Sequence, residues 1–404
     1  MATTPASYQG LLDEYRKELQ ALTKAGHSLI GYVFPHAPVE LFQAHELTPT
    51  LLRADPKTLG GYEGSLQTFC CAYARNLFGQ RATGRLAPLA GIVFAGGTCD
   101  SLQNVADVWR FRFPDDTAFR LVYPVASRAE GAVQYFAQEL RNLSQALEAR
   151  YKRPFSPHKF KDAIALSSRF RAAAQFIVAA RLVNPQVLSY AQLAALVRRF
   201  LTAPDTQAVT ALEKTSSTIR QRMAREECAA ADAIQRALLT RELKDLQFSV
   251  NASVRRIMVI GGMVDPQALA TLVNPTGKNS AEIVLDVLSF GFRTIFTSSP
   301  QLGGDPFQAM ARALLDAPTE PTQEGLPSRL AFLESMLRHL HIDGLIICEQ
   351  SFCDPDEFEA PSLAAVAAKA GIHTTRVQLD PELSDRDRVE GKIHSFLETL
   401  ATKR

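Results

Sequence analysis

The sequence lacks several features that would identify a class of protein at once. No stretch approaches the roughly 18 consecutive apolar residues that a membrane helix needs. The 44 basic and 42 acidic residues leave almost no excess charge with which to attract nucleic acid. The N-terminal stretch "MATTPASYQGLLDEYRKELQAL" turns charged and amphipathic immediately, unlike a secretory signal. We therefore expect a cytoplasmic protein that binds neither a membrane nor nucleic acid.

Several common catalytic motifs are also missing. The stretch "VIGGMVD" lacks the third glycine of a dinucleotide fingerprint, and "LGGDPFQAM" lacks the GK[ST] of a phosphate-binding loop. Neither GxSxG nor HExxH occurs. The closely spaced cysteine pairs of zinc sites are absent as well. Any shared site must therefore be assembled by the fold from distant segments.

What the chain does contain is an alternation of apolar runs with helix-like segments. The runs "HSLIGYVF", "LAGIVFA" and "FRLVYPVAS" stand in the first third, and "RRIMVIGG", "DGLIICEQ" and "TTRVQLD" stand near the end. Between them, from about 156 to 249, the pattern is helical, and 205–260 contains neither glycine nor proline. We predict an α/β protein with two Rossmann-like parallel-sheet domains (1–150 and 253–404) and a helical insert between them (151–252).

Three of the six cysteines lie at the ends of predicted elements. Cys99 follows the apolar run 92–95 through two glycines, and Asp100 or Ser101 can cap the helix that follows. Cys353 follows the run 345–348 and precedes a helix predicted over "APSLAAVAAKAG", which begins at Ala360. Cys71 opens the helix-like stretch "CAYARNLFG". Ligands of open α/β sheets bind at the carboxyl ends of strands, and a helix N-terminus favours a thiolate. This pattern predicts a thiol site in a cleft between the two sheet domains.

A structural role competes with this interpretation at each position. A single cysteine more commonly serves as a small buried apolar residue. We interpret Cys228, in the middle of a predicted helix, and Cys348, within an apolar strand, in that way. Cys70 competes with Cys71 for the third position.

Six segments, in the same order along the chain, resemble the 2-hydroxyacyl-CoA dehydratase substrate-binding component and the related benzoyl-CoA reductase subunits. They are "GYVFPHAPVELFQAHELTP", "CAYARNLFG", "GGTCDSLQNVADVW", "FKDAIALSSRFRAA", "FGFRTI" and "DGLIICEQSFCDPDEFEAPSL". In this family three cysteines hold a [4Fe–4S] cluster, and the resemblance implies Cys71, Cys99 and Cys353, with Cys70 as the alternative to Cys71. One iron would remain open to a substrate oxygen.

Two positions depart from the family pattern. His45 stands where relatives usually have glycine, and Ser289 stands near an extra cysteine of the double-cubane relatives. The other cysteines of that larger cluster are not evident either, which argues against the double-cubane branch.

The resemblance implies a lyase that eliminates water from a 2-hydroxyacyl-CoA through a ketyl radical anion. It also implies an acyl-CoA substrate, a paralogous subunit in a heterodimer, and a separate ATP-dependent iron–sulfur activator. Glu40 and His36, just after the first predicted strand, are candidates for the base, although capping or surface roles are commoner for such residues. Two alternatives stay open: a subunit of the benzoyl-CoA reductase type, and a non-catalytic paired subunit without a working cluster.

Overall fold

The computed structural model describes residues 8–58, 60–250, 254–273 and 281–401. Within these residues the chain folds into two compact units. Unit 1 comprises the described residues up to Arg169 together with Arg198–Val209 and Thr297–Glu324. Unit 2 comprises Phe170–Val197 and the described residues of the ranges 210–296 and 325–404. Each unit is therefore built from segments that lie far apart in the sequence.

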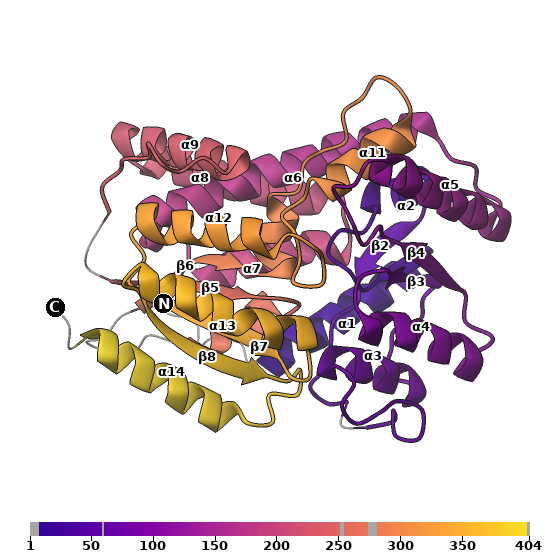
Figure 1. The fold of residues 1–404 in the computed structure, drawn as a ribbon. Helices are drawn as coiled ribbons and strands as arrows, with labels where there is room; N and C mark the ends of the chain where they lie inside the picture. The colour runs from indigo at the N-terminus through magenta and orange to yellow at the C-terminus, as the bar shows by residue number, and fades with distance from the viewer. Residues whose placement is uncertain (1–7, 59, 251–253, 274–280, 402–404) are drawn as a thin grey trace. The chain divides into compact units, whose positions relative to one another are not determined.

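Unit 1 contains a four-stranded parallel sheet in the order β2-β1-β3-β4 (Figure 1). Helices α4 and α5 pack against strands β3 and β4. The strands of this sheet are β1 (Leu29–Tyr32), β2 (Thr48–Leu51), β3 (Gly91–Gly96) and β4 (Ala118–Val122). Its helices are α1 (Tyr8–Lys24), α2 (Val39–Ala44), α3 (Ala72–Ala82), α4 (Asp100–Arg112), α5 (Ala132–Tyr151) and α11 (Pro306–Leu315).

Unit 2 contains a second four-stranded parallel sheet in the order β6-β5-β7-β8. Helices α13 and α14 pack against its strands β7 and β8. The strands are β5 (Arg255–Gly261), β6 (Ala281–Val287), β7 (Gly344–Gln350) and β8 (His373–Leu379). Its helices are α9 (Arg225–Thr240), α10 (Pro266–Leu272), α12 (Leu326–His339), α13 (Asp354–Lys369) and α14 (Arg386–Ala401), with a short irregular turn, η2, at Ser289–Arg293.

The helical segment between the two sheets forms α6 (Pro157–Val183), the short η1 (Pro185–Val187), α7 (Tyr190–Thr202), α8 (Thr206–Arg222) and α9. Helices α6, α7 and α8 each contribute residues to both units. Prolines 185 and 204 stand just beyond the ends of α6 and α7, as the sequence predicts, because proline cannot continue a helix. The division at 150 and 252 stays a prediction.

The two sheets have the same topology. Numbered from its own first strand, each sheet has the order 2-1-3-4, and every neighbouring pair is parallel. The predicted α/β class with two parallel-sheet domains is confirmed. Every residue of the inner strands β3 and β7 is buried, as in parallel strands covered on both faces, and β7 is apolar up to its last two residues, Glu349 and Gln350.

Each unit has its own apolar core. In unit 1 three phenylalanine rings pack edge to face around Trp109, the single tryptophan of the chain: Phe78, Phe94 and Phe113. In unit 2 branched side chains of the central strands, including Ile257, Val259 and Ile346, are fully buried. These cores fix the strands and therefore the loops at the strand ends.

Three details differ from the sequence-based expectations. Strand β2 was not predicted, because it is a short edge strand that contains Pro49. Helix α13 begins at Asp354 instead of Ala360 and continues through Pro361, because three acidic residues in its first turn favour an earlier start. Cys99 itself caps α4, in place of Asp100 or Ser101. Within the described ranges, no helix has both the length and the apolar composition of a membrane span.

Candidate functional site

The order 2-1-3-4 creates a switch point in unit 1, where the chain leaves the neighbouring strands β1 and β3 toward opposite sides. Open α/β sheets bind their ligands outside the carboxyl ends of the strands at such a point. His36 follows β1, and Cys99 follows β3. The topology therefore identifies the Cys99 turn as the place where this sheet would hold a ligand.

The turn between β3 and α4 requires glycine before it reaches Cys99. Gly97 has a φ of +68°, and a Cβ atom there would lie 2.2 Å from the carbonyl oxygen of Tyr123. Cys99 has extended backbone angles, and its sulfur accepts a hydrogen bond from the backbone N–H of Leu102 at 3.5 Å. This hydrogen bond caps α4 and holds the sulfur at the helix N-terminus.

The neighbouring helix α3 also has a cysteine, Cys71, as its N-cap residue, but there the side chain makes no capping hydrogen bond. The Cys71 side chain is buried, whereas Cys70 and Cys99 are half-buried. The backbone N–H of Cys71 donates a hydrogen bond to the Ser101 hydroxyl at 3.3 Å. The first turn of α4 is thereby tied to the N-cap residue of α3, and both cysteine-bearing helix starts lie together in unit 1.

The electrostatics also indicate that these thiols are neighbours. Burial raises the pKa of the Cys99 thiol to about 12, and repulsion from Cys71 and, more weakly, from Cys70 adds to this effect. Burial likewise raises the pKa of Cys70, partly offset by a hydrogen bond with Ser101 and by the charge of Arg75. Metal binding displaces such protons, because the thiolate is the ligand.

Cys353 takes the corresponding position in unit 2. It follows β7, the third strand of its sheet, and is the N-cap residue of α13, as Cys99 is of α4. Its backbone N–H donates to the carbonyl of Gln350 at 2.9 Å, which closes a tight turn through Phe352 at a φ of +59°. The buried Asp356 carboxylate accepts from the Gln350 N–H at 3.1 Å and braces this turn.

The structure thus brings Cys70, Cys71 and Cys99 together in unit 1 and places Cys353 in unit 2, so the predicted ligand set stays a prediction. Among the described residues, no group of three or more His, Cys, Asp or Glu side chains is arranged to hold a single metal ion. Cys348 is fully buried within β7, and Cys228 is half-buried near the start of α9.

The two candidate bases are buried near the end of β1. His36 is 1% exposed, and its Nε2 lies 3.1 Å from the carbonyl oxygen of Pro318 and 3.8 Å from a carboxylate oxygen of Glu320. Glu40, in α2, is 2% exposed. The Tyr123 hydroxyl donates to the His36 carbonyl at 2.9 Å and fixes the backbone there.

His45 does not line an open surface. Its side chain is fully buried, with Nδ1 2.7 Å from the carbonyl of Arg153 and Nε2 2.8 Å from the Ser144 hydroxyl. Burial lowers the pKa of His45, so the ring is neutral at physiological pH. In this structure the residue connects the end of α2 to α5 and to the segment before α6.

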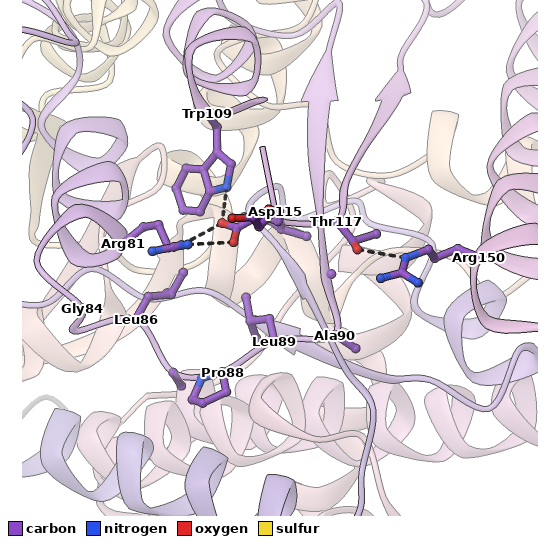
Figure 2. Close-up of a pocket in the computed structure, with 14 residues that line it drawn as sticks. Arg81, Gly84, Leu86, Pro88, Leu89, Ala90, Trp109, Asp115, Thr117 and Arg150 are labelled. Carbon is purple, nitrogen blue, oxygen red and sulfur yellow. Dashed lines mark hydrogen bonds and ion pairs between the residues drawn. The ribbon is translucent and has the colours of Figure 1, made fainter. Parts of the chain in front are cut away.

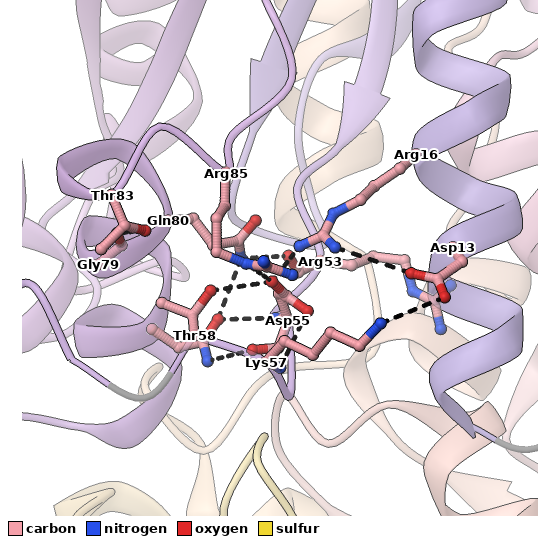
Figure 3. A network of polar contacts seen from close by, with 11 residues as sticks. Asp13, Arg16, Arg53, Asp55, Lys57, Thr58, Gly79, Gln80, Thr83 and Arg85 are labelled. Atoms are coloured by element: carbon pink, nitrogen blue, oxygen red, sulfur yellow. Dashed lines mark hydrogen bonds and ion pairs between the residues drawn. The ribbon is translucent and has the colours of Figure 1, made fainter.

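A polar cluster around Asp55 anchors helix α3, which carries Cys71 (Figure 3). The Asp55 N–H donates to the Asn76 side-chain oxygen at 2.7 Å, and the Asn76 amide donates to the Asp55 carbonyl at 2.9 Å. The Asp55 carboxylate in turn pairs with Arg16 of α1 and, at 2.5 Å, with Arg85. No sequence motif singles these residues out, because their partners come from distant segments.

A cavity at the opposite end of the unit 1 sheet is not part of this site (Figure 2). This cavity of about 350 Å³ lies at the amino end of β3, beside Gly91 and Ile92. Asp116 lines one wall of the cavity, and its carboxylate accepts a hydrogen bond from the Trp109 indole N–H and two hydrogen bonds from the Arg81 guanidinium. Trp109 lies in the last turn of α4, whereas Cys99 caps the first, so the cavity and the thiols lie at opposite ends of that helix.

The sequence is similar to subunits of two dehydratases and of a reductase. The chain is 21% identical over 400 residues to the lactoyl-CoA dehydratase subunit beta of Anaerotignum propionicum, covering 96% of this chain and 94% of that protein. It is 21% identical over 341 residues to a benzoyl-CoA reductase subunit of Thauera aromatica, covering 83% and 81% of the two chains. A third match is the (R)-phenyllactyl-CoA dehydratase beta subunit of Clostridium sporogenes, at 23% identity over 146 residues, 36% of this chain and 38% of that protein.

A family model extends this likeness over most of the chain. The model is described as 2-hydroxyglutaryl-CoA dehydratase, D-component, and it matches residues 35–400, a range that includes all the cysteines discussed above. The chain therefore belongs to the 2-hydroxyglutaryl-CoA dehydratase D-component family.

Proposed function

We propose that this chain is a subunit of a 2-hydroxyacyl-CoA dehydratase, a lyase that eliminates water from an acyl-CoA thioester. The observation that carries the proposal is the matched placement of two half-buried cysteines, Cys99 after β3 and Cys353 after β7, each the N-cap residue of the next helix. Family membership and the two dehydratase beta subunits among the relatives supply the class of reaction.

The donor set fits an iron–sulfur cluster. We assign Cys71, Cys99 and Cys353 as ligands of a [4Fe–4S] cluster, with Cys70 as the alternative to Cys71. Cysteine thiolates are the usual protein ligands of such clusters, and each thiolate binds a different iron, so they need not form the compact group that a single ion requires. Three ligands leave one iron open to a substrate oxygen. When bound, the cluster supplies single electrons at low potential.

The proposed elimination also needs a group that accepts a proton. An electron added to the thioester carbonyl gives a ketyl radical anion, the 2-hydroxyl leaves as hydroxide, and the proton on the next carbon becomes acidic; the electron is then returned. His36 and Glu40 are the proposed acceptors. The Pro318 carbonyl can only accept a hydrogen bond, so the Nε2 atom of His36 carries the hydrogen when the ring is neutral. The Nδ1 atom is then the one that takes up a proton.

The proposed partners are an acyl-CoA substrate, a paralogous subunit that completes a heterodimer, and an ATP-dependent iron–sulfur activator, all in the cytoplasm. The relatives are themselves named as the beta subunits of two dehydratases and as one subunit of a reductase, which supports a multi-subunit assembly. Omitting either protein partner from a reconstituted reaction is expected to abolish dehydration.

A subunit of the benzoyl-CoA reductase type is the second candidate, because the match to the Thauera aromatica reductase covers 83% of this chain. The two activities differ in their electron balance. Dehydration returns the added electron, so product forms without net consumption of reductant. Ring reduction consumes electrons in proportion to product, and measuring both quantities with CoA thioesters separates the candidates.

Iron and sulfide analysis after anaerobic purification tests the cluster. We expect about four irons per chain, lost in Cys99→Ala. Cys228→Ala is the matched control, because Cys228 is also half-buried and its thiol donates to the backbone carbonyls of Arg220 and Met223 within the helical segment. An iron-free wild-type protein that still supports the activity of its partner would refute the cluster and identify a non-catalytic paired subunit.

A further inference from the structure

The residues after α11 form a strap, defined here as 317–324, that belongs to unit 1 and is fastened at two points. Near its start, the Pro318 carbonyl oxygen lies 3.1 Å from Nε2 of His36. At its end, the Glu324 carboxylate accepts a hydrogen bond from the Ser127 hydroxyl at 3.2 Å. His36 follows β1 and Ser127 follows β4, the two strands that flank β3. The strap is therefore fastened at the carboxyl edge of the sheet, on both sides of β3.

Glu320 lies in the middle of the strap and faces His36. One of its carboxylate oxygens lies 3.8 Å from Nε2 of His36, and the side chains of Glu320 and His36 are 2% and 1% exposed. The Glu320 N–H donates to the Gln323 side-chain oxygen at 2.9 Å, and the Gln323 N–H donates back to the Glu320 carbonyl at 2.9 Å. This turn fixes the Glu320 backbone, so the carboxylate is held beside the imidazole in a place from which water is largely excluded.

The structure also fixes His36 relative to the end of β3. The Tyr123 hydroxyl donates to the His36 carbonyl, and the Tyr123 N–H donates to the Gly96 carbonyl at 2.8 Å. Tyr123 thereby links His36 to the last residue of β3, three residues before Cys99. The Phe34 ring packs edge to face against the imidazole, with the ring centres 5.8 Å apart. In these surroundings a carboxylate acts on the imidazole more strongly than it would in water.

The arrangement suits a base whose positive charge is compensated once it has taken up a proton. Nε2 carries the hydrogen of the neutral ring and donates it to the Pro318 carbonyl, so an incoming proton binds at Nδ1. When the substrate C–H bond breaks, its electron pair stays on the substrate, the proton forms an N–H bond at Nδ1, and the ring becomes a cation. A carboxylate oxygen 3.8 Å from the other ring nitrogen stabilises that cation.

We propose that Glu320 is a positioning residue for His36, because its buried carboxylate orients the imidazole and stabilises the imidazolium that forms on proton transfer. The inference rests on the proposed function, in which His36 accepts a proton from the acyl-CoA substrate, and Glu320 acts only through His36. Two further titratable residues are close to His36: Tyr123 directs its hydroxyl to the His36 backbone, and Glu40 follows in α2. Both are left unchanged in the variants that test the proposal.

The titration of His36 tests the proposal without the cluster or the partner proteins. Hydrogen–deuterium exchange at the imidazole C2 carbon, followed against pH by tandem mass spectrometry, gives a midpoint for His36 in the full-length chain. Glu320→Gln keeps the size but removes the charge. We expect the midpoint to fall by about 1 unit or more, because an opposite charge within about 4–6 Å favours the charged form. Glu320→Asp keeps the charge at a longer distance, should lower the midpoint by less, and also serves if glutamine prevents folding.

Glu324→Gln is the matched control. It removes a carboxylate from the same strap, but one that binds the Ser127 hydroxyl. We expect the His36 midpoint in this variant to stay at the wild-type value. An unchanged midpoint in Glu320→Gln would overturn the proposal. An equal fall in Glu324→Gln would do the same, because the strap would then act through its placement and not through the Glu320 charge.

Activity provides the second readout. In the reconstituted complex, Glu320→Gln is expected to lower kcat about 10-fold with little change in KM, because the base becomes weaker while substrate binding is untouched. The acid limb of the kcat profile should move to lower pH, as the His36 midpoint does, and Glu320→Asp should restore part of the rate. A wild-type kcat and pH profile in Glu320→Gln contradicts a role of Glu320 in proton transfer. A wild-type complex that never dehydrates its substrate refutes the proposed function instead, and the midpoint then still decides whether Glu320 acts on His36.

Discussion

Replacing Asp55 with asparagine tests whether a buried charge cluster secures the part of unit 1 that carries Cys71. The Asp55 side chain is 3% exposed, and its carboxylate pairs with Arg16 of α1 and with Arg85 beyond α3. The Thr58 hydroxyl donates to the same carboxylate at 2.9 Å. Asparagine preserves the volume but removes the charge, so the two guanidinium groups face each other without this counter-ion.

The magnitude follows from the exposure of the partners. Removing one member of a buried ion pair typically costs about 3–5 kcal/mol, because the other member is left uncompensated. The Arg16 and Arg85 side chains are 20% and 31% exposed, so water screens part of their charge. We therefore expect Asp55→Asn to lower the free energy of unfolding of unit 1 by about 2–3 kcal/mol at neutral pH.

The pH dependence of this difference is an additional test. Burial alone raises the pKa of Asp55, but hydrogen bonds from Arg85, from the Lys57 N–H and from Arg16 outweigh it and leave the pKa below its usual value. The stabilisation is therefore fully present above the unfolded-state pKa of about 4 and is lost as pH falls through the lower folded-state pKa. The wild type and the asparagine variant should converge in stability in strong acid.

Trp109 supplies the assay. It is the single tryptophan of the chain, is 1% exposed and lies in unit 1, so its fluorescence during urea unfolding reports that unit. Asp13→Asn is the matched control, because the side chains of Asp13 and of its partner Lys57 are 42% and 52% exposed. We expect this substitution to lower the free energy of unfolding by less than about 1 kcal/mol. Equal urea midpoints for Asp55→Asn and the wild type at neutral pH would refute the reasoning, as would a difference that persists unchanged in acid.

Three further substitutions follow from close contacts at the strand ends. Gly97→Ala should lower the free energy of unfolding of unit 1 by about 3 kcal/mol. Gly84→Ala is the control and should lower it by about 1 kcal/mol, because φ is also positive there but nothing lies near the added carbon. Trp109 fluorescence during urea unfolding measures both values. Asp356→Asn should lower apparent iron affinity about 10-fold by loosening the Cys353 turn, whereas Glu357→Gln should not, as chelator competition would show. In Gly291→Ala the new carbon would lie 1.9 Å from an Asp286 oxygen, so amide hydrogen exchange in β5 and β6 should accelerate; unchanged exchange contradicts this contact.

The sequence predicts the local elements well where the hydrophobic pattern decides them. The apolar runs around β3, β5 and β7 are strands, and the helix after Cys99 begins at Asp100, one of the two residues expected to cap it, because burial and capping are local properties. Strand β2 was missed because only its pairing with β1 makes the residues around Pro49 a strand. Neither pattern nor propensity reports such a pairing.

The site is predictable to a lesser extent, for a related reason. A cysteine after a glycine turn is visible in the sequence, but the partners that fix it are not. Ser101 acts on Cys71 across 30 residues, and Asn76 meets Asp55 across 21. The first contact depends on the packing of α3 against α4, and the second on the packing of α3 against the segment after β2.

The two units share one topology, but they contribute differently to the proposed ligand set. After the third strand, both units present a cysteine as the cap of the next helix, Cys99 in one and Cys353 in the other. After the second strand they diverge. Unit 1 continues to Cys71, whereas unit 2 forms the turn Ser289–Arg293, in which the buried Arg293 donates to the Gly261 carbonyl at 2.5 Å. In unit 2 the Arg293 guanidinium, hydrogen-bonded to the backbone, takes the place in this turn where unit 1 has a thiol. The proposed ligand set therefore has two cysteines in unit 1 and one in unit 2.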